Sequence, residues 1–322
     1  MALTLAEADK YSTNQVLVGV AETTVDANPL LGIMPFTPVL GNAVQYQREN
    51  AASNPTFIAA GGTVIEGTPT TSLITAALKI LIGDADIDKF LRVTRSKDQD
   101  LEAELLAMKA RNFADTWGDK AVYGSIDADP NEFDGLHQII EDDATAQVVH
   151  ASVDATSDPG ALSELDQMID LVRPRANVLI MSRRSMRSIQ TLARAQGREL
   201  ALDRIAGINR PLQFYADIPM LPCDFITDTE TLTAGGAFLA KTGGDASTIF
   251  ALRMDEAGLF GISADDPDAQ DNLERIIQLE NIGTLETKDA NRWRVKAYTA
   301  IALKETQAVA RYDGIGPAAW VN

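Results

Sequence analysis

This chain has little of what most enzymes use for chemistry. Its 322 residues include one cysteine and two histidines, and aromatic residues make up 6% of the sequence. A single cysteine rules out an intramolecular disulfide and fits a reducing compartment. Cys223 has no nucleophile motif around it, so we predict a small buried side chain there. His137 and His150 stand in no metal-ligand spacing and beside no nucleophile, so they indicate neither a zinc site nor a catalytic pair.

Long apolar runs and a basic excess are missing as well. No run approaches the roughly 20 apolar residues of a membrane span, and the first ten residues lack the pattern of a secretory signal. The formal net charge is −18. Proteins that grip phosphates place a basic excess on the contact face. We therefore expect no membrane partner and no tight or sequence-specific binding of nucleic acid.

Two acidic stretches resemble the start of a calcium-binding loop. The motif Asp84-x-Asp86-x-Asp88 is followed by Lys89, where the sharp turn of such a loop needs glycine, and Asp127-x-Asp129-x-Asn131 is followed by Glu132. In a strand the first three carboxylates share one face, which favours a solvated or ion-paired edge over a metal site. A weakly bound surface cation stays open in either place. We predict no catalytic residue, no metal site and no cofactor.

The chain does have a long extended segment from Gly41 to Ile82. Polar and apolar residues alternate from Ala43 to Glu49, as in a half-buried strand. Turn-forming and small residues fill Asn50 to Thr71, and a second strand returns through Leu73 to Ile82. A hairpin this long with a polar tip cannot bury itself in its own domain. It indicates an arm that lies on a partner.

Periodic patterns outline the rest of the chain as α+β. Ser96 is a predicted cap for a helix from Lys97 to Tyr123, whose apolar stripe consists of Leu101, Leu105, Met108, Phe113 and Trp117. Two shorter helices are predicted after Asp158-Pro159 and between Ser182 and Gly197. The predicted strands are Asn177–Met181, Tyr215–Ile226, Phe238–Met254, and Arg292–Leu303 paired with Ile276–Glu286.

The basic residues are concentrated in one region. Between Arg173 and Arg210 nine arginines stand against Glu199 and Asp203, a local charge of +7 that leaves −25 for the remainder. One interpretation is a solvated helix face. The other is a seam between subunits, where this patch meets an acidic neighbour.

Short stretches along the chain resemble, in order, the major capsid proteins of tailed bacteriophages. They include Asn28-Pro29-Leu30-Leu31, Tyr46-Gln47-Arg48-Glu49, Gly83 to Phe90, Asn131 to Leu136, Arg292 to Tyr298 and Ala308 to Arg311. Each stretch is weak alone, but the ordered set spans nearly the whole chain. That family has the Hong Kong 97-type fold, which encapsulin nanocompartments share.

The resemblance implies a division into named parts. These are an N-arm at 1–40, an E-loop hairpin at 41–82, a peripheral domain at 83–154 with a spine helix at about 96–123, an axial domain at 155–264, and further peripheral strands at 265–322. In the family, axial domains meet around the centres of pentamers and hexamers. The candidate interface residues are Tyr46, Arg48, Glu49, Phe57, Glu66, Arg183, Arg187 and Arg194.

The implied function is structural. The chain would assemble with copies of itself, through pentamers and hexamers, into an icosahedral virion capsid around phage double-stranded DNA, and it would do so in the host cytoplasm. A separate scaffolding protein, a portal and a decoration protein are the implied partners. Two alternatives stay open: an encapsulin-like nanocompartment shell, and a soluble α+β enzyme that uses a metal through Asp84, Asp86 and Asp88.

Overall fold

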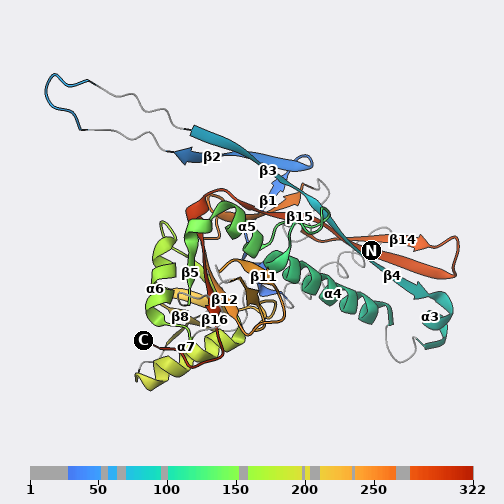
Figure 1. Cartoon of the computed structure of the whole chain (residues 1–322). Coiled ribbons are helices and arrows are strands. Elements are labelled where there is room, and N and C mark those ends of the chain that lie inside the picture. The colour runs from blue at the N-terminus through green and yellow to red at the C-terminus, as the bar shows by residue number, and fades with distance from the viewer. Residues whose placement is uncertain are drawn as a thin grey trace, which may run out of the picture.

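A computed structural model describes residues 28–51, 57–63, 70–95, 101–151, 159–197, 200–203, 211–233, 236–265 and 276–321. Most of the predicted N-arm, Glu66, Ser96 and Asp158 lie outside these residues. The described chain forms two sheets that lie side by side, with a long helix across one of them and a two-stranded hairpin that projects from the body (Figure 1).

The first sheet is organised around one long strand. Its members are β1 (Phe36–Val39), β4 (Lys79–Asp88), β13 (Leu259–Ala264), β14 (Gln278–Thr284) and β15 (Ala290–Leu303). β15 pairs antiparallel with β4 over residues 290–299, with β14 over 291–296, and with β13 over 299–303. This confirms the predicted half-buried strand near the carboxyl terminus and its pairing with the segment before it.

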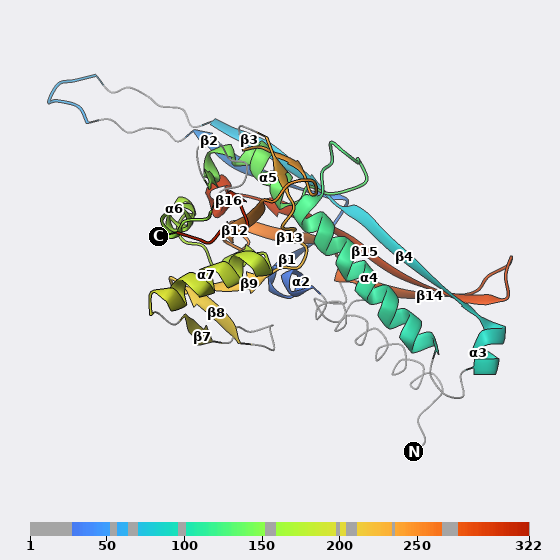
Figure 2. The same cartoon turned by 60° about the horizontal axis from the view of Figure 1, so that its bottom comes forward.

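Helix α4 (Leu101–Tyr123) packs across this sheet, and α3 (Lys89–Arg95) connects the two. Figure 2 shows α4 running alongside β4 and β15. Trp117 is buried and donates a hydrogen bond from Nε1 to Thr299 Oγ1 at 3.1 Å. The long helix is confirmed, and Phe113 and Trp117 of the predicted apolar stripe are buried, but Met108 is 54% exposed. The buried line follows a helical face through Leu106, Ala110, Phe113, Trp117 and Ala121.

The second sheet has seven strands in the order β5-β16-β12-β6-β9-β8-β7. Their bounds are β5 (Val148–His150), β6 (Val178–Met181), β7 (Ala201–Asp203), β8 (Leu212–Tyr215), β9 (Ile218–Pro222), β12 (Ser247–Leu252) and β16 (Val309–Ile315). The central strand β6 is buried on both faces, as its continuous apolar run requires. Leu179 and Met181 join the core under helices α6 (Leu162–Leu171) and α7 (Arg183–Ala195), whereas Val178 and Ile180 join the core beneath α5 (Leu136–Asp143).

Local signals decide where these elements begin and end. Ser182 caps α7 as predicted, because its side chain accepts a hydrogen bond from Ser185 N, and Gly197 has φ +70° beyond the end of that helix. The segment from Tyr215 to Ile226 supplies strand structure as predicted: it holds the end of β8 and the whole of β9, with a turn between them at Ala216 and Asp217, which have positive φ. The segment 238–254 also supplies strands as predicted, β11 (Phe238–Ala240) and β12, and β11 pairs with β10 (Thr231–Leu232).

The two sheets do not follow the predicted domain boundaries. β5 and β16 lie outside residues 155–264 and yet belong to the seven-stranded sheet, while β13 lies inside that range and belongs to the other sheet. The chain crosses between the sheets several times, which no local sequence signal marks. The division into named domains stays a prediction.

The projecting hairpin is formed by β2 (Ala43–Ala51) and β3 (Thr70–Ala77), which pair antiparallel from Ala43↔Ala77 to Ala51↔Thr70. We call residues 43–77 the arm. The predicted return strand to Ile82 is divided, because Leu78 N donates to Asn42 O at 2.9 Å and closes the root of the arm. From Lys79 onward the chain belongs to β4 and to the first sheet.

A close approach at Gly118 of α4 gives a test of this packing. A Cβ atom there would lie 2.4 Å from Phe225 Cε2 and 2.6 Å from Nδ2 of the buried Asn28. In an open helix position alanine is more stable than glycine by about 1 kcal/mol. Overpacking costs roughly 1–3 kcal/mol, so we expect Gly118→Ala to lower the free energy of unfolding, measured by chemical denaturation. The control is Gly83→Ala, which meets no atom within 4 Å. A stabilised Gly118→Ala variant would contradict the packing described here.

Candidate assembly surfaces

The root of the arm is fixed to the subunit body by Tyr46 and Arg48. Arg48 is 7% exposed; its Nη2 donates to the carbonyl oxygen of Leu303 at 2.5 Å, and its Nη1 pairs with Asp143 Oδ1 at 2.6 Å. Tyr46 Oη donates to the same carbonyl at 2.7 Å, and burial raises the Tyr46 pKa. Leu303 is the last residue of β15. Both side chains therefore attach the arm to its own first sheet, although the sequence suggested contacts with a neighbour.

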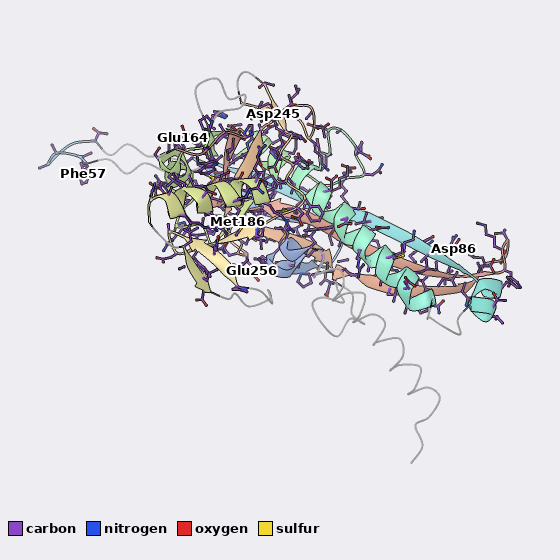
Figure 3. The ribbon with its side chains drawn as sticks, turned by 90° about the horizontal axis from the view of Figure 1, so that it is seen from below. Phe57, Asp86, Glu164, Met186, Asp245 and Glu256 are labelled. Atoms are coloured by element: carbon purple, nitrogen blue, oxygen red, sulfur yellow. The ribbon has the colours of Figure 1, made fainter. Side chains whose placement is uncertain are left out.

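Residues 57–63, the described part of the tip of the arm, show no such attachment. Figure 3 shows Phe57 at one end of the molecule, far from the body and opposite Asp86. Phe57 is 106% exposed and Ile58 is 50% exposed. A short turn follows, in which Gly62 N donates to Ala59 O at 2.9 Å. The side chain of Glu49 lies outside the described residues, as Glu66 does; the Glu49 backbone pairs with Thr71.

The arginine patch is partly engaged within the subunit. Arg183 of α7 pairs with Asp224, and Arg184 donates to the carbonyl oxygens of Asp228, Asp245 and Ile315. Arg187 and Arg194 are exposed on α7 and form no ion pair with any residue that the structure describes. The solvated-face and seam interpretations both remain open for these two side chains.

The acidic stretch on β4 is ion-paired. Arg294 Nε lies 2.7 Å from Asp84 Oδ1, and Arg292 Nε lies 2.5 Å from Asp86 Oδ1, across the register of β4 and β15. The hydrogen bonds from these arginines hold the pKa values of both carboxyl groups below their usual range. The ion-paired edge is therefore the correct interpretation for Asp84 and Asp86.

The second acidic stretch, at Asp127 to Asn131, and the single cysteine also make structural contacts. Asp129 Oδ1 accepts from the backbone N of Asn131 at 2.9 Å in a local turn. Cys223 is buried, and burial raises its thiol pKa to about 11, so it stays protonated at neutral pH. Within the described ranges no group of three His, Cys, Asp or Glu residues is placed to hold a metal ion, and no helix is long and apolar enough to span a membrane.

Both histidines lie in one polar cluster that the sequence patterns did not indicate. His137 stacks on Phe238 with ring centroids 4.2 Å apart, and its Nδ1 lies 3.3 Å from Nη1 of the buried Arg311. Because a guanidinium only donates, Nδ1 accepts. The ring proton is then on Nε2, which lies 3.4 Å from the buried Glu230. Arg311 also pairs with Glu141 at 3.1 Å.

This cluster joins α4, α5 and the seven-stranded sheet. Tyr123, in the last turn of α4, donates to Glu230 Oε1 at 2.5 Å, and Glu230 also accepts from Thr248 of β12. Asp313 of β16 is fully buried and binds both Arg311 Nε, at 3.0 Å, and His150 Nδ1, at 2.5 Å. The sequence signal for the cluster is the pair of charged residues Arg311 and Asp313 in an otherwise mainly apolar strand.

The His150–Asp313 pair predicts a pH dependence. The hydrogen bond that His150 Nδ1 donates to the Asp313 carboxylate raises the His150 pKa above its usual 6.5. A raised folded-state pKa gives stability that is complete below the unfolded pKa and is lost as the pH rises through the folded value. We expect the free energy of unfolding to fall from pH 6 toward pH 8.5, measured by urea denaturation. In His150→Gln, which keeps a hydrogen bond without a titrating ring, this fall should be smaller; identical pH profiles for the two proteins would refute this account of the pair.

Removal of the Arg48 anchor should loosen the arm. Breaking a buried ion pair costs roughly 3 kcal/mol or more. Asp143 is one-third exposed, so its carboxylate regains water, and we expect about 2 kcal/mol for Arg48→Met. Limited proteolysis should then cut near the root of the arm faster than in the parent protein. The matched control is Gln47→Met on the opposite, exposed face of β2. Equal stability and cleavage of the two variants would show that the anchor is unimportant.

Comparisons with known proteins agree with this geometry. No protein-family model matches the chain, and no curated protein matches it by sequence. Solved structures match over nearly the whole length. A chain of the holo-SrpI encapsulin complex from Synechococcus elongatus PCC 7942 aligns with a TM-score of 0.67 and 15% identity, covering 91% of this chain and 89% of that one.

Two phage-type particles give similar alignments. A chain of Microbacterium phage Oxtober96 has a TM-score of 0.59 at 12% identity, covering 88% of this chain and 90% of that one. The capsid of the native GTA particle has a TM-score of 0.57 at 13% identity, covering 89% and 90%. At these identities the likeness defines the fold: an α+β architecture of capsid and encapsulin shells. It is the Hong Kong 97-type fold, as the sequence predicted.

Proposed function

We propose that the chain is a major capsid protein of a tailed bacteriophage, a structural subunit that assembles with copies of itself into a closed icosahedral shell around double-stranded DNA. The fold supports a shell subunit, and the ordered phage-like stretches of sequence support a capsid. Pentamers and hexamers would be the intermediate rings. Scaffolding, portal and decoration proteins would be separate partners, and assembly would take place in the host cytoplasm.

The observation that carries the proposal is the contrast between the two ends of the arm. The root is held by a buried arginine and a tyrosine, whereas the tip presents a completely exposed phenylalanine far from the body (Figure 3). Burial of such a side chain contributes roughly 2 kcal/mol. An arm that is held at its root and ends in an exposed apolar side chain is suited to a heterologous contact, which closes into rings when it is repeated.

An encapsulin-like nanocompartment is the second candidate. The SrpI encapsulin complex gives a higher TM-score than the two phage-type particles described above. A capsid and a nanocompartment are both closed shells built from copies of one chain, and they differ in whether the shell encloses DNA or protein cargo. A metal-dependent enzyme is not supported, because the carboxylates of Asp84 and Asp86 are bound by arginines.

Shortening the arm tests the proposed assembly. Residues 52–69 are replaced by Asn-Gly, a pair that closes a two-residue hairpin between β2 and β3. We expect the subunit to keep its circular dichroism and its unfolding midpoint, because residues 57–63, the described part of the deleted segment, are exposed and belong to neither core cluster. Light scattering and negative-stain microscopy should show closed particles for the parent protein, and only monomers or small oligomers for the variant.

The contents of the parent particles separate the two candidates. Nuclease-protected double-stranded DNA in particles from phage-producing cells supports the capsid. Particles that enclose protein cargo and no DNA support the nanocompartment. Normal closed particles from the shortened variant would contradict the role proposed for the arm.

A further inference from the structure

Three exposed arginines form a straight row on helix α7. Arg183, Arg187 and Arg194 are spaced by four and seven residues, which places them within about 40° of one another around the helix. The row is about 16 Å long, since a helix rises by roughly 1.5 Å per residue. α7 lies on the side of the body away from the arm (Figure 1). We call these three residues the arginine row, which is one continuous cationic strip on the surface of the isolated subunit.

Positive charge is concentrated around this row. Residues 173–210 carry a formal charge of +7, whereas the remainder of the chain carries −25. Arg184, which is next to the row on α7, is already held by three backbone carbonyl oxygens of its own subunit. Arg183 does pair with Asp224, but both side chains are more than half exposed, so water and external anions compete for that guanidinium. The row therefore remains available to an external anion.

The chemistry of this face suits phosphate better than it suits another protein surface. Specific protein interfaces have an apolar centre with aromatic anchors. Helix α7, all of which the structure describes, exposes no large apolar side chain. A guanidinium binds two phosphate oxygens at once through parallel N–H donors. Each strand of duplex DNA presents a phosphate every ~3.4 Å along the duplex axis, so a row about 16 Å long faces several of them.

The polar side chains between the arginines are engaged within the subunit. Gln190 Nε2 donates to Gln213 Oε1 at 2.5 Å, and Thr191 Oγ1 donates to the Arg187 carbonyl oxygen of its own helix at 2.8 Å. α7 also contains no aromatic residue on which a base could stack. Base sequence is read through contacts to base edges, whereas phosphate contacts carry no direct sequence information. The face therefore favours contact with the nucleic-acid backbone alone.

We propose that the arginine row binds the phosphate backbone of the DNA enclosed by the shell, weakly and without reading its sequence. This inference rests on the proposed capsid function, and it names the face of the subunit that is turned toward the DNA. The acidic remainder of the chain repels phosphates, so the row determines which face the DNA approaches. Each contact is weak, and its repetition over the many subunits of a shell makes the sum effective.

Salt-dependent binding of a DNA duplex tests the proposal. The probe is a fluorescently labelled duplex of mixed sequence, and its anisotropy is measured with the full chain kept below the concentration at which it assembles. The logarithm of the binding constant falls with the logarithm of the salt concentration by about 0.9 for each phosphate neutralised, so three arginines predict a loss of roughly fortyfold between about 50 and about 200 mM salt. The variant with Arg187→Gln and Arg194→Gln retains one contact, and its loss should be roughly threefold to fourfold.

The matched control carries Lys288→Gln and Lys304→Gln, two exposed positions that flank β15. It removes the same two charges from another part of the chain, and it should keep the roughly fortyfold loss. Glutamine is nearly as good a helix former as arginine, so the circular dichroism of the arginine variant should not change. Duplexes rich in A·T and duplexes rich in G·C should bind the parent chain with equal affinity.

The outcomes separate this inference from the proposed function. A smaller salt dependence in the arginine variant alone supports the phosphate contact. No measurable binding at about 50 mM salt, or the same salt dependence in the arginine variant and the control, overturns it and leaves the shell function standing. An arginine variant that keeps its DNA binding but no longer forms particles assigns the row to an acidic surface of a second copy, which also overturns the proposal. A chain that binds the duplex through the row and never forms particles contradicts the shell function alone.

Chemical modification tests where the row lies in the particle. Phenylglyoxal modifies accessible guanidinium groups, and mass spectrometry gives the rate of modification at Arg187 and Arg194. Both side chains should react more slowly in DNA-filled particles than in particles from which the DNA has been released. Equal rates in the two preparations would overturn the placement of the row against the DNA.

Discussion

The hydrogen bond from Arg48 to the carbonyl oxygen of Leu303, at the C-terminal end of β15, is the interaction on which the position of the arm depends. A two-stranded hairpin on its own is at best marginally stable in water. Here its inner face is held at the root by one buried guanidinium that joins the Leu303 carbonyl to Asp143 of α5, with the Tyr46 hydroxyl on the same carbonyl. The charge is costly to bury, and several hydrogen bonds offset that cost. The root of the arm is therefore fixed to the subunit body, and the exposed tip is available to contact a partner.

The two sheets of the subunit body, to which the arm is attached, are joined to each other by buried contacts. The C-terminal part of α4 ties the first sheet to the second, because Trp117 binds β15 and Tyr123 binds the buried Glu230. The two histidines, Arg311 and Asp313 complete that junction. Three of its buried atoms, His137 Nε2, Arg311 Nε and Asp313 Oδ2, make ion-pair contacts without a hydrogen bond of regular geometry. The arm is therefore attached to a body in which both sheets are joined.

Much of the architecture follows from local patterns. Alternation from Ala43 to Glu49 predicts the arm, and the cap at Ser182 with the glycine at 197 predicts α7. Periodicity shows which side chains share a face, but it does not show which element covers that face. For that reason the pattern of the arm does not predict that Arg48 binds the subunit's own first sheet, nor that the return strand divides at Leu78. The histidine cluster brings together residues that are up to 174 positions apart, and no local pattern predicts such a meeting.

The most direct test of the account is a cryo-electron microscopy reconstruction of the particles formed by the full chain. The central claim is that the arm, fixed at its root by Arg48, ends on another subunit. The account predicts a closed shell in which density for residues 57–63 lies on an adjacent copy of the chain. Density for the same residues folded against their own subunit, or a purified protein that stays monomeric at every concentration, would contradict it.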